Sequence, residues 1–426
     1  MRTAGLALLV ANAAAPAMAQ LSPASPISLP APLTAAAFTQ AVLAHNASLE
    51  AMRQAVAAAV ARIKPAGALE DPMLSVSSAP RTFGSAMGVG GSVEVSQSLP
   101  WWGTLEARTA VARAEADATS DDLDALRLSL AALARGELSD WVYLHRALDV
   151  NAANQAVLTE LRDTARIRFS TGQVPQEDVL QADVERALLT EQRLELRGEQ
   201  SSIQARMNAL LDRDPQAPLP VPADLPVPTS LPAEELLAQR ALTHPRLQML
   251  AAQERSASAQ EQLAEKQRFP KFGVSAGYNS MWADPAMRPM IGIAIRIPLD
   301  QGKYRAEIDA ARAEAHRAAS SLESGRASLL ADVAAAYASV SQAAQSLALY
   351  RDELVPLARS TFEVTQAEYS SGRGDFLNVL TAEQHRLDTE LTLARLRSQY
   401  YERLADLNRL TAGGLLSLPA AEEEVP

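Results

Sequence analysis

The sequence predicts a mainly α-helical fold with β-hairpins, in which long coiled-coil helices form a tandem repeat. Hydrophobic residues make up 48% of the 426 residues and aromatic residues only 4%, so Ala and Leu, which favour helices, supply most of the apolar content. Proline, which breaks helices, is absent between Pro100 and Pro175 and between Pro298 and Pro356. Matching residues also recur in the two halves of the chain. Together these observations predict two similar helical halves.

The acidic balance and the absence of cysteine exclude several classes of function. The formal net charge is -11, which argues against a basic surface for nucleic acid, so we expect no nucleic-acid partner. The chain contains no cysteine. This excludes disulfides, thiolate metal sites, cysteine nucleophiles and lipid attachment through an N-terminal cysteine.

The first residues have the pattern of a secretion signal. Arg2 is followed by an apolar run at 5–10 and by small residues that end at Ala19, after which we expect cleavage. A membrane anchor is the alternative, but Asn12 and Pro16 interrupt a run that is already shorter than the roughly 20 residues a spanning helix needs. No later segment offers a long apolar stretch. Membrane insertion of the mature chain would therefore require β-strands in a closed barrel.

A proline-rich segment divides the mature chain into two halves. Residues 214–232 read DPQAPLPVPADLPVPTSLP, which favours an extended linker. The predicted domains are a signal peptide at 1–19, a first repeat at 20–213, this linker, a second repeat at 233–412 and an acidic tail at 413–426. Helices are expected at about 34–63, 104–169 and 176–212 in the first repeat, and at about 245–268, 302–369 and 376–411 in the second.

The two halves match at the ends of their long helices. Residues 169–172 read Phe-Ser-Thr-Gly and residues 369–372 read Tyr-Ser-Ser-Gly, and Asn208 corresponds to Asn408 at the same offset of 200 positions (208 and 408). This indicates a tandem duplication. At a rise of 1.5 Å per residue the helix at 104–169 spans about 100 Å, and the two shorter helices of its repeat together have nearly the same length. We expect them to stack end to end along it.

The helices carry apolar residues on more than one face, which is typical of a wall in which each helix touches a neighbour on either side. An ordinary helical bundle or solenoid is the alternative. Helix lengths near 100 Å and the scarcity of bulky aromatics favour a single-layer coiled-coil tube.

Four segments have the pattern of β-strands: residues 73–78, 90–99, 272–281 and 289–299. In residues 291–297 bulky side chains alternate with small or charged ones, as expected when one face meets lipid and the other a lumen. Two half-buried hairpins of a soluble domain are the alternative. Four strands cannot close a barrel alone, so the membrane interpretation requires oligomerisation.

The residues at the strand-to-helix junctions and at the helical turns resemble a known family. Residues 97–103 and 297–302 are similar to the strand-to-helix junctions of outer-membrane factors of the TolC type, and residues 170–179 and 369–380 to their helical hairpin tips. The resemblance covers essentially the whole mature chain. It implies a homotrimer with a twelve-stranded barrel in outer-membrane lipid and a periplasmic helical tube, which docks on a periplasmic adaptor and an inner-membrane RND-type transporter. The proline-rich linker would lie at the equatorial belt.

Two segments most resemble the heavy-metal branch of this family, the cobalt-zinc-cadmium type. They are the junction at residues 100–103, which contains Trp101 and Trp102, and an outer loop with the side chains Met281, Trp282, Met287 and Met290. Thioethers suit Cu(I), but loop and interface packing is the favoured explanation of these methionines. We therefore assign no metal ligand and no cofactor.

The resemblance also gives the candidate functional residues. Gly172 and Gly372 are expected at hairpin tips that meet the adaptor, since glycine permits the backbone angles of such turns. The gate candidates are Asp178, Asp375, Asn378 and Thr381. Asn378 and Thr381 stand where the best-known family member has aspartates, which implies a less acidic constriction. The alternative for Asp375 is that it only caps the returning helix.

No catalytic site is predicted, and the chain is expected not to be an enzyme. Residues 88–93 fail the dinucleotide-binding glycine pattern, and the five histidines lack metal-ligand spacing. A duct for drug efflux or type I protein secretion remains an alternative to a metal-efflux duct. A periplasmic adaptor is disfavoured by the duplicated hairpins. A structural coiled-coil protein would leave the signal peptide and the four strands unexplained.

Overall fold

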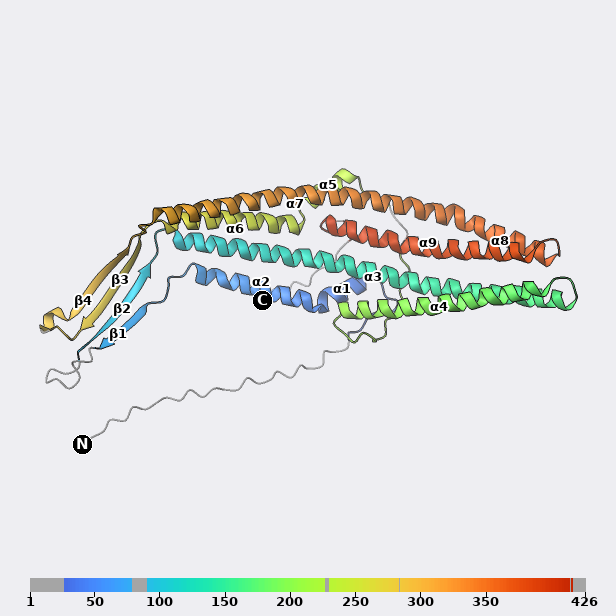
Figure 1. The fold of residues 1–426 in the computed structure, drawn as a ribbon, viewed down its shortest axis with the longest axis horizontal. Helices are drawn as coiled ribbons and strands as arrows, with labels where there is room; N and C mark the ends of the chain where they lie inside the picture. Colours follow the sequence, from blue (N-terminus) through green and yellow to red (C-terminus); the bar gives the residue numbers. More distant parts are fainter. Residues whose placement is uncertain (1–26, 79–89, 227–229, 283, 414, 417–426) are drawn as a thin grey trace, which may run out of the picture.

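The structure is a computed structural model that describes residues 27–78, 90–226, 230–282, 284–413 and 415–416. The predicted signal peptide at 1–19 lies outside the described residues, and so does most of the predicted tail at 413–426. The molecule is long, with a small sheet at one end of a set of long helices (Figure 1). Among the described residues, no helix combines the length and the apolar character needed to cross a membrane.

The two repeats contain the same order of elements. The first comprises α1 (Ala35–His45), α2 (Ala47–Ala66), β1 (Met73–Ser78), β2 (Gly91–Leu99), α3 (Thr104–Ser170) and α4 (Gln176–Leu210). The second comprises α5 (Glu234–Ala241), α6 (Pro245–Gln267), β3 (Lys271–Asn279), β4 (Pro289–Arg296), α7 (Gln301–Leu349), α8 (Val355–Ser370) and α9 (Phe376–Leu410). The mainly helical fold with two β-hairpins is therefore confirmed, with strand bounds within a few residues of those expected.

The predicted helix at 34–63 is in fact two helices, α1 and α2, which are divided at Asn46. The Asn46 side chain accepts a hydrogen bond from the Ser48 amide at 3.1 Å and donates one to the Leu210 carbonyl at 3.0 Å. It therefore caps α2 and fixes the start of that helix against the end of α4. In the second repeat His244 caps α6 in the same way, with its Nδ1 accepting from the Arg246 amide at 3.0 Å.

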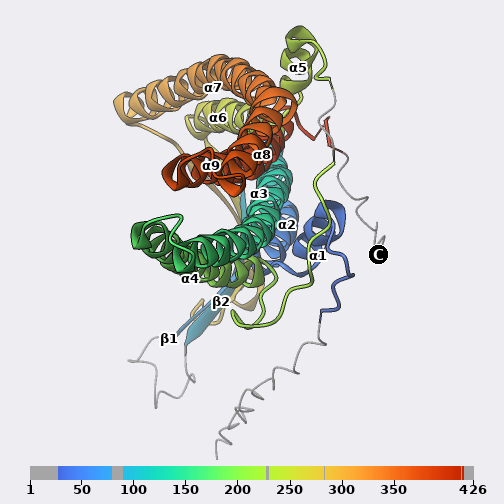
Figure 2. The same ribbon diagram turned by 90° about the vertical axis from the view of Figure 1, so that its right-hand side faces the viewer.

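The helices form a wall whose centre is α3. In Figure 1, α2 and α1 lie in line with α4 along one side of α3, and α6 lies in line with α9 along the other. The long α7 and α8 then follow α6 and α9. The end-on view in Figure 2 shows these rows side by side rather than wrapped around one central helix. The expected end-to-end stacking of short helices on a long one is confirmed in both repeats.

The second long helix is interrupted, which the sequence prediction of one helix at 302–369 did not include. Tyr350–Leu354 forms a π-helical turn between α7 and α8, and the Val355 amide donates to the Tyr350 carbonyl, five residues back. Pro356 follows immediately. Because proline has no amide hydrogen, it leaves a carbonyl of the preceding turn without its helical partner, and a wider turn accommodates this. The first repeat has no proline here, and α3 is continuous.

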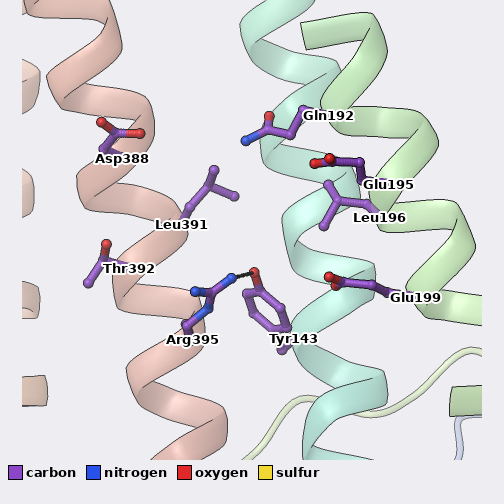
Figure 3. Close-up of a pocket in the computed structure, with 9 residues that line it drawn as sticks. All are labelled: Tyr143, Gln192, Glu195, Leu196, Glu199, Asp388, Leu391, Thr392 and Arg395. Carbon is purple, nitrogen blue, oxygen red and sulfur yellow. Dashed lines mark hydrogen bonds between the residues drawn. The ribbon is translucent and has the colours of Figure 1, made fainter. Parts of the chain in front are cut away.

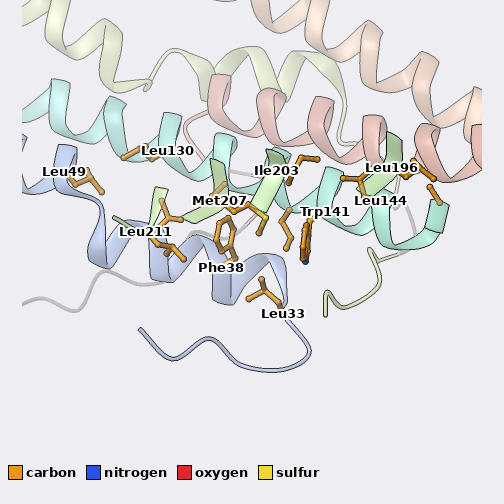
Figure 4. Packing of buried hydrophobic residues seen from close by; sticks show 14 of the residues in the cluster. Leu33, Phe38, Leu49, Leu130, Trp141, Leu144, Leu196, Ile203, Met207 and Leu211 are labelled. Carbon is orange, nitrogen blue, oxygen red and sulfur yellow. The ribbon is translucent and has the colours of Figure 1, made fainter. Parts of the chain in front are cut away.

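The described part of the proline-rich linker, residues 214–226 and 230–232, contains a turn near Asp214 and an isolated β-bridge at Pro222, and it is held against the middle of the wall. The Leu33 amide donates to the Val221 carbonyl, and the Ala223 amide donates to the Leu33 carbonyl, both at 2.9 Å. The Trp141 indole of α3 donates to the Pro220 carbonyl at 3.2 Å. Beneath this segment lies the apolar cluster of Figure 4, where α1, α3 and α4 meet and which includes Leu33, Phe38, Leu49, Leu130, Trp141, Leu144, Leu196, Ile203, Met207 and Leu211.

The sheet is antiparallel and has the order β1-β2-β3-β4. The central β2–β3 pairing joins the two repeats, with Val93 opposite Tyr278. Because paired residues share a face and side chains alternate along a strand, the register gives the sheet two different faces. One face is mainly apolar and carries Leu74, Val76, Val93, Val95, Gln97, Leu99, Phe272, Val274, Ala276, Tyr278, Ile291, Ile293 and Ile295. The other is mainly small or polar and carries Met73, Ser75, Ser77, Ser92, Glu94, Ser96, Ser98, Lys271, Gly273, Ser275, Gly277, Met290, Gly292, Ala294 and Arg296.

Candidate functional site

The two helical tips lie together at the end of the wall opposite the sheet (Figure 1). Gly172 has a φ of +71° and Gly372 a φ of +77°, in the left-handed region that glycine adopts without strain. The Gly172 amide donates to the Phe169 carbonyl and the Gly372 amide to the Tyr369 carbonyl, both at 2.9 Å. Each glycine thus ends its long helix and reverses the chain.

The two tips have the same backbone conformation but different surroundings. A Cβ atom added at Gly172 would meet nothing within 4 Å, whereas one added at Gly372 would lie 3.4 Å from Nη2 of Arg168. Gly372 therefore lies against a side chain of the first repeat, while Gly172 is open.

A contact between the repeats holds the tips together. The Arg168 guanidinium of α3 donates to the Tyr369 carbonyl and lies over the Tyr369 ring, 4.7 Å from its centroid. The Tyr369 hydroxyl donates to Oδ2 of Asp178 on α4 at 3.1 Å. Tyr369 is only 1% exposed. We call Arg168, Asp178 and Tyr369 the tip cluster.

The hydroxyl of Tyr369 is protonated at neutral pH and can therefore donate its hydrogen bond to Asp178. Burial raises the pKa of Tyr369 to about 12, with the negative charge of Asp178 adding to the effect, so the hydroxyl keeps its proton at neutral pH. Burial also raises the pKa of Asp178, while the bond from Tyr369 opposes that rise and the nearby charges of Glu177 and Asp375 add to it. Among the gate candidates, Asp178 is thus the one with a hydrogen bond to a side chain of the other repeat.

The other three gate candidates lie on α9 and are exposed. Asp375 occupies the N-cap position directly before α9, and its side chain makes no capping hydrogen bond. Asn378 and Thr381 follow at three-residue steps on the same exposed side of the helix. The Thr381 hydroxyl donates to the Leu377 carbonyl within α9 at 2.8 Å.

A buried ionic cluster that was not predicted from the sequence lies on α9, about two turns after Asp375. Glu383 is 3% exposed, and Arg386 donates to its two carboxylate oxygens at 2.8 and 2.7 Å. Arg386 also donates to Asn154 of α3, and Glu390 accepts from Arg359 of α8 at 2.7 Å. Burial raises the pKa of Glu383, while Arg386 opposes the rise. The spacing of 383, 386 and 390 places these side chains on one face of α9 and was the available indication in the sequence.

A polar groove of about 440 Å³ lies between α4 and α9, with Tyr143 of α3 at its base (Figure 3). The Arg395 guanidinium donates to the Tyr143 hydroxyl at 2.9 Å. The groove is lined by Tyr143, Gln192, Glu195, Leu196, Glu199, Asp388, Leu391, Thr392 and Arg395. Within the described ranges of the chain, no group of three or more His, Cys, Asp or Glu side chains is arranged to hold a metal ion.

The fold and its tips match a known family. Residues 38–212 and residues 236–413 each match the family model of the outer membrane efflux protein. Since these two regions together cover more than half of the chain, the chain belongs to the outer membrane efflux protein family. The resemblance to TolC-type outer-membrane factors is thereby confirmed for the family as a whole.

Solved structures share this fold. A membrane protein from Pseudomonas aeruginosa is 18% identical with a TM-score of 0.79, and the alignment covers 92% of this chain and 96% of that one. The outer membrane protein VceC from Vibrio cholerae is 18% identical with a TM-score of 0.74, covering 89% of this chain and 96% of that one. The MtrE outer membrane channel of Neisseria gonorrhoeae, in its open state, is 18% identical with a TM-score of 0.75, covering 91% of each chain. A search of curated proteins gave no match.

The tip cluster yields a testable energetic coupling. Tyr369→Phe and Asp178→Asn each remove one partner of the 3.1 Å hydrogen bond, so their effects should not add, with a coupling of about 1 kcal/mol because Asp178 is partly solvated. The measurement is hydrogen exchange of the amides at the two tips in both single variants and the double variant. Strictly additive effects would mean that this bond does not hold the tips together.

Proposed function

We propose that the chain is a subunit of a trimeric outer-membrane channel that serves as the passive exit duct of a tripartite efflux assembly, and that it is not an enzyme. Its partners in this proposal are two further copies of the chain, a periplasmic adaptor and an inner-membrane RND-type transporter. The observation that carries the proposal is the sheet with one apolar face, one polar face and two unpaired edges, continuous with a helical wall.

The two faces of the sheet support insertion in a bilayer around a water-filled lumen. The apolar face is largely exposed in the single chain, and Ile291 of the edge strand β4 is 91% exposed. Exposed apolar surface of this kind is costly in water and favourable in lipid. Most side chains of the opposite face are small or polar, as in the interior of a membrane barrel, although Met73 and Met290 also lie on it.

The unpaired edges support a trimer. In the described sheet β1 and β4 each have only one neighbouring strand, and in hydrocarbon an unpaired backbone edge is expensive. Pairing β4 of one copy with β1 of the next in a ring of three copies gives twelve strands and leaves no edge. The helical wall offers matching surfaces, with exposed Leu180, Val184 and Leu188 on α4 and exposed Leu357 and Val364 on α8.

The tips are proposed to dock on the adaptor. Besides the glycine turns, exposed apolar side chains gather near them: Ile167, Phe169 and Leu377. Exposed apolar groups grouped at one end of a protein are typical of a surface that binds another protein.

The gate is proposed to lie just inside the tips, with Asp375, Asn378 and Thr381 of three copies around the lumen. One carboxylate from each copy in a narrow pore would attract cations and repel its neighbours. Asp178 is proposed to act by joining the repeats through Tyr369, so that closure depends on the tip cluster and ion preference on Asp375.

The proposed cargo is heavy-metal cations, with drug efflux or type I protein secretion as the alternative. This proposal depends on the resemblance of residues 100–103 and of the methionine-containing loop to the heavy-metal branch. One residue of this junction has a packing role, since Trp101 stacks on Phe269 with ring centroids 4.8 Å apart. Met281, Met287 and Met290 are exposed, and we assign them no metal contact.

A periplasmic adaptor or a structural coiled coil is less well supported, because neither explains the two-faced sheet.

The trimer can be tested by crosslinking at the sheet edges. The chain has no cysteine, so the double variant Leu74→Cys, Ile291→Cys introduces thiols only on β1 and β4. A flexible bis-maleimide should link it into a trimer in outer-membrane fractions, whereas either single variant should stop at dimers or below. Recovery of the wild-type mature chain as a soluble periplasmic monomer would overturn both the barrel and the duct.

Docking can be tested by Gly372→Val in a strain that lacks its own duct, with metal and drug resistance as readouts. Valine at a φ of +77° is strained and lies against Arg168, so resistance should fall while trimers still insert in the membrane. The matched control is Gly172→Val, which has the same backbone strain and open surroundings. Loss of resistance in both supports docking, loss in Gly372→Val alone points to the Arg168 contact, and full resistance in both rules out a sensitive docking surface.

The gate can be tested by Asp375→Asn in single-channel recordings. Removing the charge should weaken block by divalent cations several-fold while leaving thermal stability nearly unchanged, because the side chain makes no capping hydrogen bond. Unchanged block together with a lower melting temperature would show that the residue is a helix cap after all.

A further inference from the structure

The end of the helical wall that meets the sheet is the basic end of an acidic chain. The chain has only four lysines, and all lie at ends of elements next to the sheet: Lys64, Lys266, Lys271 and Lys303. Residues 265–271 carry three cationic side chains and one carboxylate, and residues 296–307 carry three cationic side chains and two carboxylates. The whole chain, by contrast, has a formal net charge of -11. Positive charge is therefore in excess in these two segments of the second repeat, while the neighbouring segments of the first repeat also carry Glu70, Asp71 and Glu106.

An aromatic group lies at the same junction. Trp101 stacks on Phe269 with ring centroids 4.8 Å apart and lies 6.1 Å from Phe272. Trp102 meets Trp101 edge-on at 4.9 Å and Phe272 at 5.7 Å, yet 72% of Trp102 is exposed. Exposed Trp rings at the end of an apolar strand face are typical of the boundary between hydrocarbon and water.

Two of the cationic side chains lie against this aromatic group. The Arg268 guanidinium lies 5.1 Å from the centroid of the Phe269 ring. The Lys266 side chain passes beside the turn that follows Trp102, since a Cβ atom at Gly103 would lie 3.5 Å from its Cε and 3.8 Å from its Nζ. We call Trp102, Lys266, Arg268 and Phe272 the collar.

The collar adjoins the apolar face of the sheet through Phe272. Phe272 lies on the apolar face, opposite Leu99 and Ile295. The next pair in the register, Lys271 and Arg296, lies on the other face because side chains alternate along a strand. The junction thus has one cationic pair, Lys271 and Arg296, on the polar face of the sheet, and a second pair, Lys266 and Arg268, beside the aromatic group that contacts Phe272.

Resting on the proposed function, in which the apolar face meets lipid, we infer that the collar binds the headgroups of anionic phospholipids in the membrane leaflet on the helical side. The apolar face ends at Phe272, so acyl chains end there too and phosphates lie beside Lys266 and Arg268. Lysine and arginine pair with phosphate oxygens through charge-assisted hydrogen bonds. Trp102 lies at the depth where indole rings anchor proteins in the interface. The occupant is therefore a lipid phosphate rather than free phosphate, because the cations adjoin an apolar surface.

The test uses the purified full-length trimer in a nonionic detergent, titrated with short-chain phosphatidylglycerol or phosphatidylcholine, with bound lipids counted by native mass spectrometry. The double variant Lys266→Gln, Arg268→Gln should weaken phosphatidylglycerol binding about 25-fold, or about five-fold for each charge removed. The matched control Lys271→Gln, Arg296→Gln removes the same charge from the polar side and should bind as the wild type does. Trimer content on native gels checks the folding of both variants.

Three outcomes would overturn the inference: equal binding of the two lipids by the wild type, equal loss in both double variants, or full competition by inorganic phosphate. These outcomes are distinguishable from failure of the proposed function. If the wild-type chain is found in the outer membrane as a trimer but shows no lipid preference, only the collar is refuted. If it is not inserted in the membrane, the duct proposal fails first.

Discussion

In a wall one helix thick, a helix has to bury apolar side chains on two opposite sides. The long helix α3 does so along most of the length of the molecule. It contacts α1, α2 and α4 along one side and α6 and α9 along the other. Small side chains let neighbouring helices approach closely on both sides, and the buried alanines of α3 are Ala107, Ala112, Ala114, Ala116, Ala131, Ala134, Ala147 and Ala165. The low aromatic content follows, because bulky rings would push such rows apart. Where several rows meet under the linker, Phe38 and Trp141 can be buried.

Much of this fold could be predicted because its determinants are local. Long runs of helix formers without proline predicted the long helices, and the alternation of bulky with small or charged side chains predicted the strands. The duplication predicted that the elements follow in the same order in both repeats. One error came from a contact that is distant in sequence, and the other from the local effect of a proline. The break at Asn46 involves neither proline nor glycine and is stabilised partly by the Leu210 carbonyl, 164 residues away. The π-helical turn at Tyr350–Leu354 lies one turn before Pro356, which the sequence analysis had placed inside a continuous helix.

The site was less predictable than the fold. Glycine in a turn is a local property, and the turns at Gly172 and Gly372 have the expected backbone. The tip cluster is not local, since Arg168 contacts a tyrosine 201 residues away. Nothing in the sequence near Asp178 indicates that its carboxylate accepts a hydrogen bond from a tyrosine of the other repeat. The burial of Glu383 and Arg386 depends likewise on how α9 packs against α3.

The duplication makes the two tips similar, and a few substitutions make them unequal. Phe169 and Asn378 stand where the other repeat has Tyr369 and Asp178. The bond from hydroxyl to carboxylate therefore forms once in each chain, from the second repeat to the first, and Phe169 has no hydroxyl with which to make the reverse bond. The two repeats also differ further from the tips. There α3 is continuous, whereas the corresponding helix of the second repeat is divided into α7 and α8 by the π-helical turn. Each chain therefore has two kinds of hairpin, one built on the continuous α3 and one with an interrupted helix, and Tyr369 of the second is bound to Arg168 and Asp178 of the first.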